Sequence, residues 1–317
     1  MSRGYLLIDG SNVAHASNNG TPLSIGDQPT QAIYNFLRTM RPMMSVYSML
    51  TPVVLWDGSS WRYRAFPDYK ASRNKPAVKP YEIKAKALRE DLKKQLPFIR
   101  EGLSLLGIRQ LVALNYEADD LAGMLVKRYT GAGSRDAKII MISGDQDWIQ
   151  LVRPRVAWRD PVHDKFVSHG NIMEKEGVPS PRAHLEVKCL WGDKGDDIPG
   201  VGGIGKDGAI EFIAKYGSVA AFLNQCADKS IDIDKLPKKF RDLATSDEKQ
   251  ELYRRNMRLM DLTTKERPEP VNLKLTRGEL DIPKFQAFCE QFLFNSMLSD
   301  INRWCEPFAP QEEAIAA

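Results

Sequence analysis

Three short apolar runs, each followed closely by acidic residues, constrain this chain more than any other feature of its sequence. Runs of this length without polar alternation are typical of strands that are buried on both faces. The runs are Tyr5–Ile8, Val53–Trp56 and Ile139–Ile142, with a weaker fourth at Gln110–Leu114. Segments with helical periodicity lie between them, near Gln31–Ser48, Ala87–Leu106 and Ala118–Tyr129. Strands that alternate with helices predict an α/β fold built on a parallel sheet.

Acidic residues follow the runs at the points where the strands are expected to end. The carboxyl ends of parallel strands meet at one edge of a sheet and form a crevice for ligands. A single Asp after a strand is ordinarily a helix N-cap or a turn residue, and an acidic first turn complements the helix dipole. Several such groups at one edge favour a metal site instead. The candidate residues are Asp9, Asp57, Glu117, Asp119, Asp120, Asp145 and Asp147, joined by Asp193 and Asp196 in a later glycine-rich stretch.

The ligand type narrows the choice of metal. Carboxylates that lie close together repel one another, and some must take up a proton unless a cation neutralises them. Hard oxygen ligands suit Mg²⁺ or Mn²⁺, whereas zinc prefers His and Cys. The chain has four histidines, and none pairs at zinc-like spacing. Two metal ions about 4 Å apart are the usual means of in-line phosphoryl displacement, so the sequence predicts phosphodiester chemistry.

A strongly basic segment follows Asp57 directly. Residues 62–94 hold eleven Lys and Arg against four Asp and Glu, a net charge of +7, whereas the whole chain has +4. Five aromatic residues are found in or next to this segment. Basic residues mixed with aromatics suit a single-stranded backbone whose bases stack. The alternative is a solvated loop and helix face without a ligand.

A glycine-rich turn opens a second, mainly helical module. The residues of interest are Gly200, Gly202, Gly203, Gly205 and Lys206. Glycines let the backbone approach a phosphate closely, and the N-terminus of the helix that follows favours an anion. The turn is not a P-loop, because Asp207 follows Lys206 and no strand precedes the turn. A nonspecific contact with a duplex backbone fits it better, and a flexible loop is the alternative.

Other bulk features indicate a cytosolic protein. The four cysteines have no metal-ligand spacing, so we expect buried thiols in a reducing compartment. Asp9 interrupts the apolar run near the N-terminus, which argues against a signal peptide. No apolar stretch approaches the roughly 20 residues needed to span a membrane.

Taken in order, these motifs resemble those of the 5′-nuclease superfamily. That family includes bacteriophage 5′-exonucleases, flap endonucleases and the 5′-nuclease domain of bacterial DNA polymerase I. The match covers about residues 4–265, and five or six motifs in order are specific although each alone is weak. The matching segments are Asp9–Asn12, Asp57 with Arg64 and Pro67–Arg73, Glu117–Asp120, Ser143–Asp147, Gly192–Val201 and Arg255–Leu262.

The resemblance implies a fold and a domain plan. The fold would be PIN-like α/β, with a parallel central sheet flanked by helices. The catalytic domain would cover residues 1–178, with a helical arch at about 60–95 through which a 5′ single strand passes. A helix–turn–helix-like DNA-binding subdomain would cover 179–265, and a C-terminal extension 266–317.

The resemblance also implies roles for matching residues. A first Mg²⁺ or Mn²⁺ site would involve Asp9, Asp57, Glu117, Asp119 and Asp120, directly or through water, and a second Asp145, Asp147, Asp193 and Asp196. Lys70 and Arg73 would contact the scissile phosphate, Tyr69 would stack near it, and Lys188 matches another basic position. Arg64 and Lys75 would bind DNA. The glycine-rich turn would hold duplex DNA and a potassium ion.

The chain departs from the family pattern at three positions. Ser72 and Asp197 stand where the family usually has Asn, and Ala16 stands where it often has a basic residue. The last departure removes one expected phosphate contact. All nine carboxylates are present, so we expect an active enzyme, and no polymerase-like segment follows, so we expect a stand-alone nuclease.

The predicted function is that of a divalent-metal 5′→3′ exonuclease and structure-specific 5′-flap endonuclease. It would leave 5′-phosphate products and act in DNA replication, repair or recombination. Its partners would be DNA with 5′ flaps or 5′ ends at duplex junctions, and a replication polymerase, in the cytoplasm of a bacterium or of a phage host. Two alternatives stay open: a DNA-junction binding protein without catalysis, and a PIN-like ribonuclease.

Overall fold

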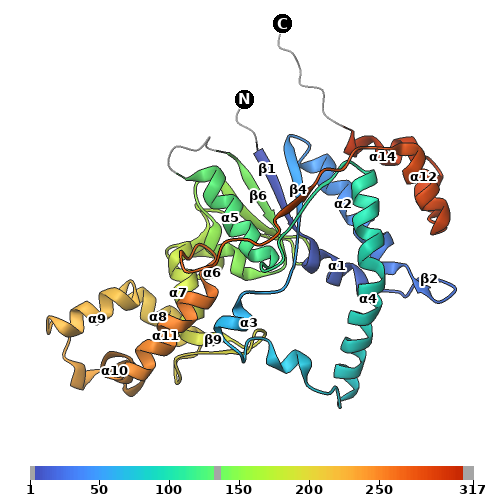
Figure 1. Ribbon diagram of the computed structural model, residues 1–317. Helices are drawn as coiled ribbons and strands as arrows, with labels where there is room; N and C mark the ends of the chain where they lie inside the picture. The colour runs from blue at the N-terminus through green and yellow to red at the C-terminus, as the bar shows by residue number, and fades with distance from the viewer. Residues whose placement is uncertain (1–3, 132–136, 310–317) are drawn as a thin grey trace, which may run out of the picture.

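A seven-stranded sheet forms the centre of the protein, with strand order β11-β5-β4-β1-β6-β7-β8 (Figure 1). The computed structural model describes residues 4–131 and 137–309. The five inner strands run parallel, and the edge strands β11 and β8 are antiparallel to their neighbours. The strands are β1 (Gly4–Asp9), β4 (Leu50–Trp56), β5 (Arg109–Val112), β6 (Ile139–Ile142), β7 (Val156–Asp160), β8 (Lys165–Val167) and β11 (Lys274–Thr276).

The four strands expected from apolar runs are confirmed, but β7 and β8 were not predicted. Strand β7 reads Val-Ala-Trp-Arg-Asp and has a half-buried Arg159, so it lacks the continuous apolar pattern of the inner strands. Strand β8 has only three residues, with Phe166 exposed. Strand β8 is the edge strand, and β7 is its inner neighbour.

Helices cover both faces of the sheet. Alternate residues of β1 point to opposite faces, so Leu6 and Ile8 pack on one side and Leu7 on the other. On the Leu6 side lie α1 (Gly10–Asn18), α2 (Gln31–Val46) and α4 (Pro80–Leu105). On the Leu7 side lie α5 (Ala118–Thr130) and the 3-10 helix η2 (Gln146–Leu151). The predicted helices after β1, before β5 and after β5 are therefore present.

Helices dominate the part of the chain after residue 178, as expected. They are α7 (Pro181–Trp191), α8 (Lys206–Tyr216), α9 (Val219–Ala227), α10 (Lys238–Thr245) and α11 (Asp247–Met260), preceded by the short α6 (Ile172–Glu176). Their core is aromatic, with Phe212 packed on Tyr216, Phe222 and Phe240. It is continuous with the apolar layer beneath α5, so the helical part and the sheet share one core.

A small hairpin was not predicted in this helical part. It pairs β9 (Gly192–Asp193) with β10 (Ile198–Pro199) in antiparallel register. The turn between them carries Lys194, Gly195, Asp196 and Asp197. Two-residue strands give no periodic signal in a sequence, but this pair fixes the second group of acidic residues on a tight loop.

The C-terminal segment packs back onto the sheet. Strand β11 pairs with β5, and the following helices lie against α2 and α4. Arg41 of α2 donates from Nε to the Trp304 carbonyl at 3.1 Å. The elements are α12 (Ile282–Gln291), α13 (Asn295–Leu298), α14 (Ile301–Cys305) and the 3-10 helix η4 (Glu306–Phe308). The segment thus contributes to the core from Phe285 onward, and residues 310–317 lie outside the described residues.

Helix α4 begins earlier than expected and projects from the body. It has 26 residues, and its first fully buried residue is Leu92 (Figure 1). The helix was expected from Ala87 only, because residues 80–86 show no apolar face. The remaining short elements are β2 (Ser24–Ile25), β3 (Gln28–Pro29), α3 (Arg62–Ala65) and the 3-10 helices η1 (Ala71–Asn74) and η3 (Ile233–Lys235).

The predicted burial of the cysteines is confirmed. Cys189, Cys226, Cys289 and Cys305 are all buried free thiols. Within the described ranges, no helix combines the length and the apolar character that a membrane crossing requires.

Candidate active site

Three neighbouring strands deliver acidic residues to the same edge of the sheet. Strand β1 lies between β4 and β6, so Asp9, Asp57 and Asp145 come from adjacent strand ends. Asp9 caps α1 by accepting from the Asn12 backbone N–H at 2.9 Å. Its second oxygen accepts from the Ser143 hydroxyl at 2.7 Å. Asp9 therefore has the ordinary N-cap role of an Asp that follows a strand. It is also a member of the converging acidic group.

Asp57 is held next to the start of α5. Its Oδ1 accepts from the Ala118 backbone N–H at 2.7 Å, and the Gly58 N–H donates to the Tyr116 carbonyl at 2.8 Å. Gly58 lets the two loops lie in direct contact: a Cβ there would be 2.1 Å from the Ala113 carbonyl oxygen. This close approach brings Asp57 beside Glu117.

Replacing Gly58 with alanine should therefore destabilise the protein. The added methyl group meets backbone atoms that cannot move aside, and we expect a loss of about 1–3 kcal/mol in the free energy of unfolding, measured by urea denaturation. Gly170→Ala is the matched control, because a Cβ at Gly170 has nothing within 4 Å. Equal stability of the two variants would contradict this account of the loop contact.

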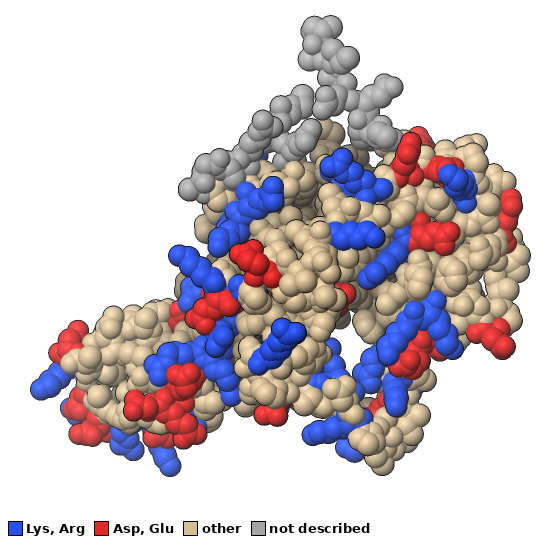
Figure 2. Space-filling model, in the orientation of Figure 1, with Lys and Arg blue, Asp and Glu red and all other residues tan. Residues whose placement is uncertain are grey.

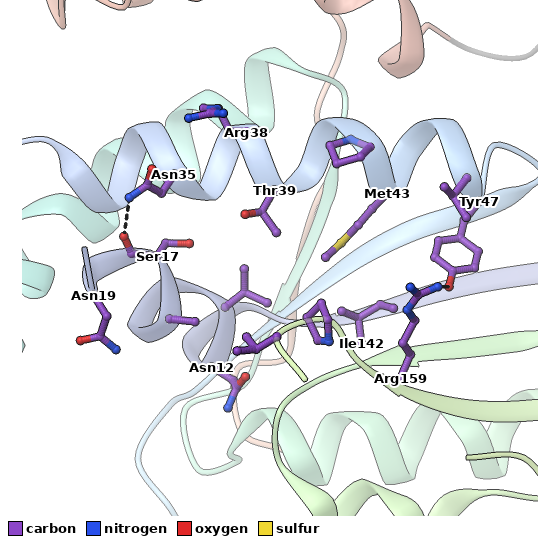
Figure 3. Close-up of a pocket in the computed structure, with 16 residues that line it drawn as sticks. Asn12, Ser17, Asn19, Asn35, Arg38, Thr39, Met43, Tyr47, Ile142 and Arg159 are labelled. Atoms are coloured by element: carbon purple, nitrogen blue, oxygen red, sulfur yellow. Dashed lines mark hydrogen bonds between the residues drawn. The ribbon is translucent and has the colours of Figure 1, made fainter. Parts of the chain in front are cut away.

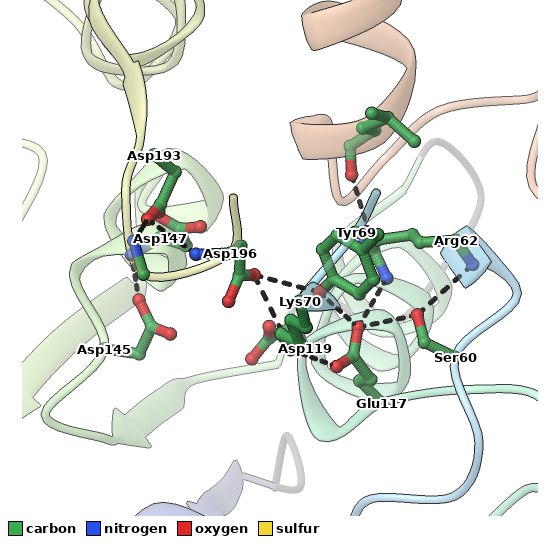
Figure 4. Close-up of polar contacts among 12 residues, drawn as sticks. Ser60, Arg62, Tyr69, Lys70, Glu117, Asp119, Asp145, Asp147, Asp193 and Asp196 are labelled. Atoms are coloured by element: carbon green, nitrogen blue, oxygen red, sulfur yellow. Dashed lines mark hydrogen bonds and ion pairs between the residues drawn. The ribbon is translucent and has the colours of Figure 1, made fainter. Parts of the chain in front are cut away.

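A buried ionic network surrounds the start of α5 (Figure 4). The Arg62 guanidinium donates to both oxygens of Asp120, at 2.9 and 3.0 Å, and to Glu117 at 3.1 Å. Its Nε donates to the Leu259 carbonyl at 2.7 Å. Arg62 is 3% exposed and Asp120 is 1% exposed. Two expectations need correction. Arg62 was counted in the basic segment expected to bind a single strand, but it is a buried structural cation. Asp120 was expected in the first metal site, but its side chain pairs with Arg62 instead.

Tyr69 and Lys70 also point into this network. The Tyr69 hydroxyl donates to Glu117 at 2.8 Å and to Asp196 at 2.9 Å. Its ring is 2% exposed and packs among apolar residues of α7 and α11. The expectation that Tyr69 stacks near the scissile phosphate does not fit this structure, because the ring is enclosed by these residues. The Lys70 ammonium group pairs with Glu117 and lies 3.5 Å from Asp196.

The second acidic group gathers around Lys188. Its ammonium group pairs with Asp147 and lies 3.1 Å from Asp193. The β9–β10 hairpin fixes Asp193, whose Oδ1 accepts from the Gly195 backbone N–H at 2.8 Å. Asp145 accepts from the Asp147 backbone N–H at 2.8 Å and so caps η2. Figure 4 shows the Asp145, Asp147 and Asp193 side chains on one side and the Glu117 group on the other, with Asp196 between them.

The pKa values show how crowded these carboxylates are. Burial, aided by repulsion from Asp57, raises the pKa of Asp9 to about 7. Burial and the neighbouring Asp145 and Asp9 raise the pKa of Asp119 well above its usual range. Burial also opposes ionisation of Glu117, but Lys70 and Arg62 outweigh it and bring its pKa to about 2. Crowding thus opposes ionisation of Asp9 and Asp119, whereas the cations beside Glu117 favour it.

The donor set fits a divalent cation of the Mg²⁺ type. Every candidate ligand offers carboxylate oxygen, which hard cations prefer. Among the described residues, no three His, Cys, Asp or Glu side chains are arranged to hold a metal ion as they stand. The ammonium groups of Lys70 and Lys188 lie among the carboxylates. In this structure Lys70 therefore occupies the oxygens of Glu117, and Lys188 those of Asp147 and Asp193, that a metal ion would use.

The other predicted arch residues face solvent. Arg64 and Lys75 are exposed, and the Arg73 guanidinium lies 3.0 Å from Asp196 with half of its side chain exposed. Lys and Arg side chains lie along the projecting part of α4 and across the hollow from it (Figure 2). Basic groups therefore border the acidic site on the side where the segment 62–94 crosses it.

The glycine-rich turn adopts backbone conformations that favour glycine. Gly202 and Gly203 have φ values of 90° and 72°. The turn leads to α8, whose N-cap Gly205 offers no side chain to the free N–H groups of the first turn. A Cβ at Gly202 would be 2.8 Å from the Lys249 ammonium, and one at Gly208 would be 2.7 Å from that of Lys239.

Lys239 and Lys249 were not singled out in the sequence. They lie more than 30 residues beyond the turn, and no local pattern links them to it. Together with Lys206 they make the surface around the glycine-rich turn basic. Arg62 was missed for a different reason, because its basic neighbours made it look like part of an exposed segment.

Two residues of α11 connect this helix to the β9–β10 hairpin. Asn256 is fully buried and donates from Nδ2 to the Cys189 carbonyl at 2.8 Å and the Pro199 carbonyl at 2.9 Å. Arg255 donates to the same Pro199 carbonyl at 3.1 Å. The Arg255–Leu262 motif thus fixes the hairpin that carries Asp193 and Asp196.

Asn12 lines two cavities. One of about 600 Å³ contains Asp145, Lys188 and Asp193 in its wall. The other, of about 560 Å³, lies between α1 and α2 and has Arg38, Tyr47 and Arg159 among its lining residues (Figure 3). The second cavity includes Asn12, from the Asp9–Asn12 motif, and Ala16, but none of the predicted catalytic, metal-binding or DNA-binding residues.

Two family models match consecutive parts of the chain. The 5′-3′ exonuclease N-terminal resolvase-like domain matches residues 4–178, and the 5′-3′ exonuclease C-terminal SAM fold matches residues 179–281. The chain belongs to the 5′-3′ exonuclease family. The predicted family, fold class and enzyme class are thereby confirmed.

Individual proteins with 5′-3′ exonuclease or DNA polymerase I names are similar to this chain in sequence. A 5′-3′ exonuclease of Aquifex aeolicus is 33% identical over 221 residues, which is 68% of this chain and 71% of that protein. A thermostable DNA polymerase I of Thermus filiformis is 31% identical over 93% of this chain. The chain spans about a third of the length of the DNA polymerase I relatives it matches.

Solved structures of a bacteriophage T5 enzyme share the fold. A T5 5′-exonuclease with bound divalent zinc ions has a TM-score of 0.67 at 23% identity, covering 96% of this chain and 100% of that one. A T5 flap endonuclease in a complex with DNA and metal ions has a TM-score of 0.63 at 24% identity, covering 96% and 100%. The first of these neighbours carries zinc ions, and the second carries DNA and metal ions.

Proposed function

We propose that this protein is a divalent-metal-dependent 5′→3′ exonuclease and 5′-flap endonuclease that hydrolyses DNA to 5′-phosphate products. The main support is the convergence of Asp9, Asp57 and Asp145 from three adjacent parallel strands. A basic, partly projecting segment borders them. Replication, repair or recombination in the cytoplasm would be its setting.

Two groups of carboxylates would hold the metal ions. Asp9, Asp57, Glu117 and Asp119 would serve the first site and Asp145, Asp147, Asp193 and Asp196 the second, with Asp120 acting through Arg62. Bound Mg²⁺ or Mn²⁺ supplies an activated water and neutralises charge on the phosphate.

The chain's own cations would orient the substrate. Lys70 and Lys188 lie among the carboxylates and would donate hydrogen bonds to the scissile phosphate once metal ions replace them there. Arg73 would bind the same phosphate from the open side, and Arg64 and Lys75 the strand that leads to it. Ser60, Trp61 and Arg62 would keep Glu117 and Asp120 in place.

The helical part would bind the duplex. We assign residues 1–178 to catalysis, 179–265 to duplex binding and 266–317 to an extension that completes the sheet. The turn at Gly200–Gly205 with Lys206 would contact the phosphate backbone, helped by Lys239 and Lys249. A potassium ion at this turn and a replication polymerase as partner follow from the family resemblance.

One cleavage experiment tests the proposal. Matched 5′-flap, nicked, blunt-duplex and RNA–DNA substrates are incubated with the purified protein, with Mg²⁺ or with excess EDTA. We expect cutting of 5′-flap and 5′-ended DNA with Mg²⁺ and a loss of at least about a thousandfold with EDTA. Binding of the flap without cutting in Mg²⁺ or Mn²⁺ would support the junction-binding alternative. A strong preference for RNA strands would support the PIN-like ribonuclease.

A further inference from the structure

Trp191 differs from the other tryptophans of the chain. Trp56, Trp61, Trp148 and Trp158 are at most 6% exposed, and Trp304 stacks on Phe285 and Phe308. Trp191 is 40% exposed and belongs to no apolar cluster of the core. An exposed tryptophan leaves a large apolar surface in water, and such residues are enriched where proteins bind partners or ligands.

The position of Trp191 links it to the acidic site. It is the last residue of α7, three residues after Lys188, so the two side chains lie on the same side of the helix. Both line the cavity of about 600 Å³, together with Asp145, Asp193, Lys194 and Lys206. The aromatic ring thus lies in the same cavity as the second carboxylate group.

Cations around the ring suit a phosphate-linked ligand. The Lys206 ammonium lies 5.9 Å from the centre of the Trp191 ring, and Lys206 opens α8, whose first N–H groups have no side-chain cap. Lys188, Lys194 and Lys206 give the cavity three ammonium groups. An aromatic ring beside cations is the arrangement that takes the base and the backbone of unpaired nucleotides.

We propose that Trp191 stacks on the base of a nucleotide adjacent to the scissile phosphate. Lys188 would hold the scissile phosphate at the carboxylates. Trp191, one helical turn away, would stack on the base, and Lys206 would bind the neighbouring phosphate. This inference rests on the proposed nuclease function and adds a positioning residue to it. The base would have to be unpaired to reach the ring, so Trp191 favours substrates that fray at the cleavage point.

The test combines a protein change with a substrate change. Trp191→Ala and Trp191→Phe are compared with the wild type on three 5′-flap substrates. One carries all bases, and the other two lack the base on the 5′ or the 3′ side of the scissile phosphate. We expect Trp191→Ala to lower kcat/KM about tenfold on the complete substrate, and Trp191→Phe to recover most of the loss. On the substrate that lacks the stacked base, the wild type and Trp191→Ala should cut equally well.

Controls separate this role from a structural one. Phe166→Ala changes a residue of similar exposure, 42%, that does not line the cavity, and it should cut all three substrates as the wild type does. A Trp191→Ala defect of equal size on all three substrates, or none at all, would overturn the stacking inference alone. If Trp191→Ala does not fold, Trp191→Leu provides the same comparison. A wild type that cuts none of the substrates would overturn the proposed function and this inference together.

Discussion

Replacing Asp145 with asparagine should abolish DNA cleavage while leaving DNA binding intact. Asparagine has nearly the same shape and keeps an oxygen that accepts from the Asp147 backbone N–H, so the start of η2 should persist. The change removes one negative charge from the group that faces Lys188 and Asp193. With fewer charges to hold a divalent cation, we expect the cleavage rate to fall by about 4 kcal/mol in activation free energy, roughly a thousandfold.

The measurement has two parts. Single-turnover cleavage of a 5′-flap in Mg²⁺ gives the rate, and fluorescence anisotropy of the same DNA in EDTA gives the affinity. Asp164→Asn is the matched control, because Asp164 lies in the β7–β8 turn with 84% of its side chain exposed and a positive φ that asparagine tolerates. Wild-type cleavage by Asp145→Asn would exclude this carboxylate from the metal site, whereas loss of binding would show that its role is structural.

Replacing Arg62 with methionine should produce the largest loss of stability. The change leaves Asp120 and Glu117 buried without their main cation and the Leu259 carbonyl without its donor. Removing one partner of a buried ion pair costs about 3–5 kcal/mol, because the remaining charge stays buried. Arg62→Lys should not recover this, since one ammonium group cannot reproduce the paired contacts of the guanidinium.

Arg64 provides the comparison for this prediction. It lies two residues further along the same short helix and is exposed. Arg64→Met should change the free energy of unfolding by less than about 0.5 kcal/mol but weaken DNA binding and reduce its salt dependence. Urea denaturation measures the first effect and anisotropy at several salt concentrations the second. Equal stability of the Arg62 and Arg64 variants would contradict the buried network.

The sheet and its acidic edge could be predicted because they depend on local patterns. Leu6, Leu7 and Ile8 are buried in the centre of the sheet, and a run of such residues has few other stable arrangements. Asp9 and Asp57 end their strands, so the parallel order alone brings them together. The first turn of α5 could be predicted for the same reason, since Glu117 and Asp119 come a few residues after strand β5.

The burial of Arg62 and Tyr69 could not be predicted. Both lie in a segment whose local composition is basic and polar, and their burial depends on α7 and α11, more than 100 residues away in the sequence. The same limit applies to Lys239 and Lys249, which approach the glycine-rich turn only in the folded chain. Strand β7 was missed because Arg159 and Asp160 interrupt its apolar pattern.

The attachment of α4 has a consequence for how the site opens. From Leu92 onward the helix is anchored in the core, and Gln95 accepts from the Ala32 backbone N–H at 2.7 Å. Residues 80–91 have no buried side chain, and Val78, Tyr81 and Ile83 near this end are more than half exposed. A helical segment of about 12 residues is only marginally stable by itself. Its local unfolding and refolding should therefore cost little free energy. Under the proposed function, this end of α4 would give way to a DNA end while the sheet that positions Asp9 and Asp57 stays folded.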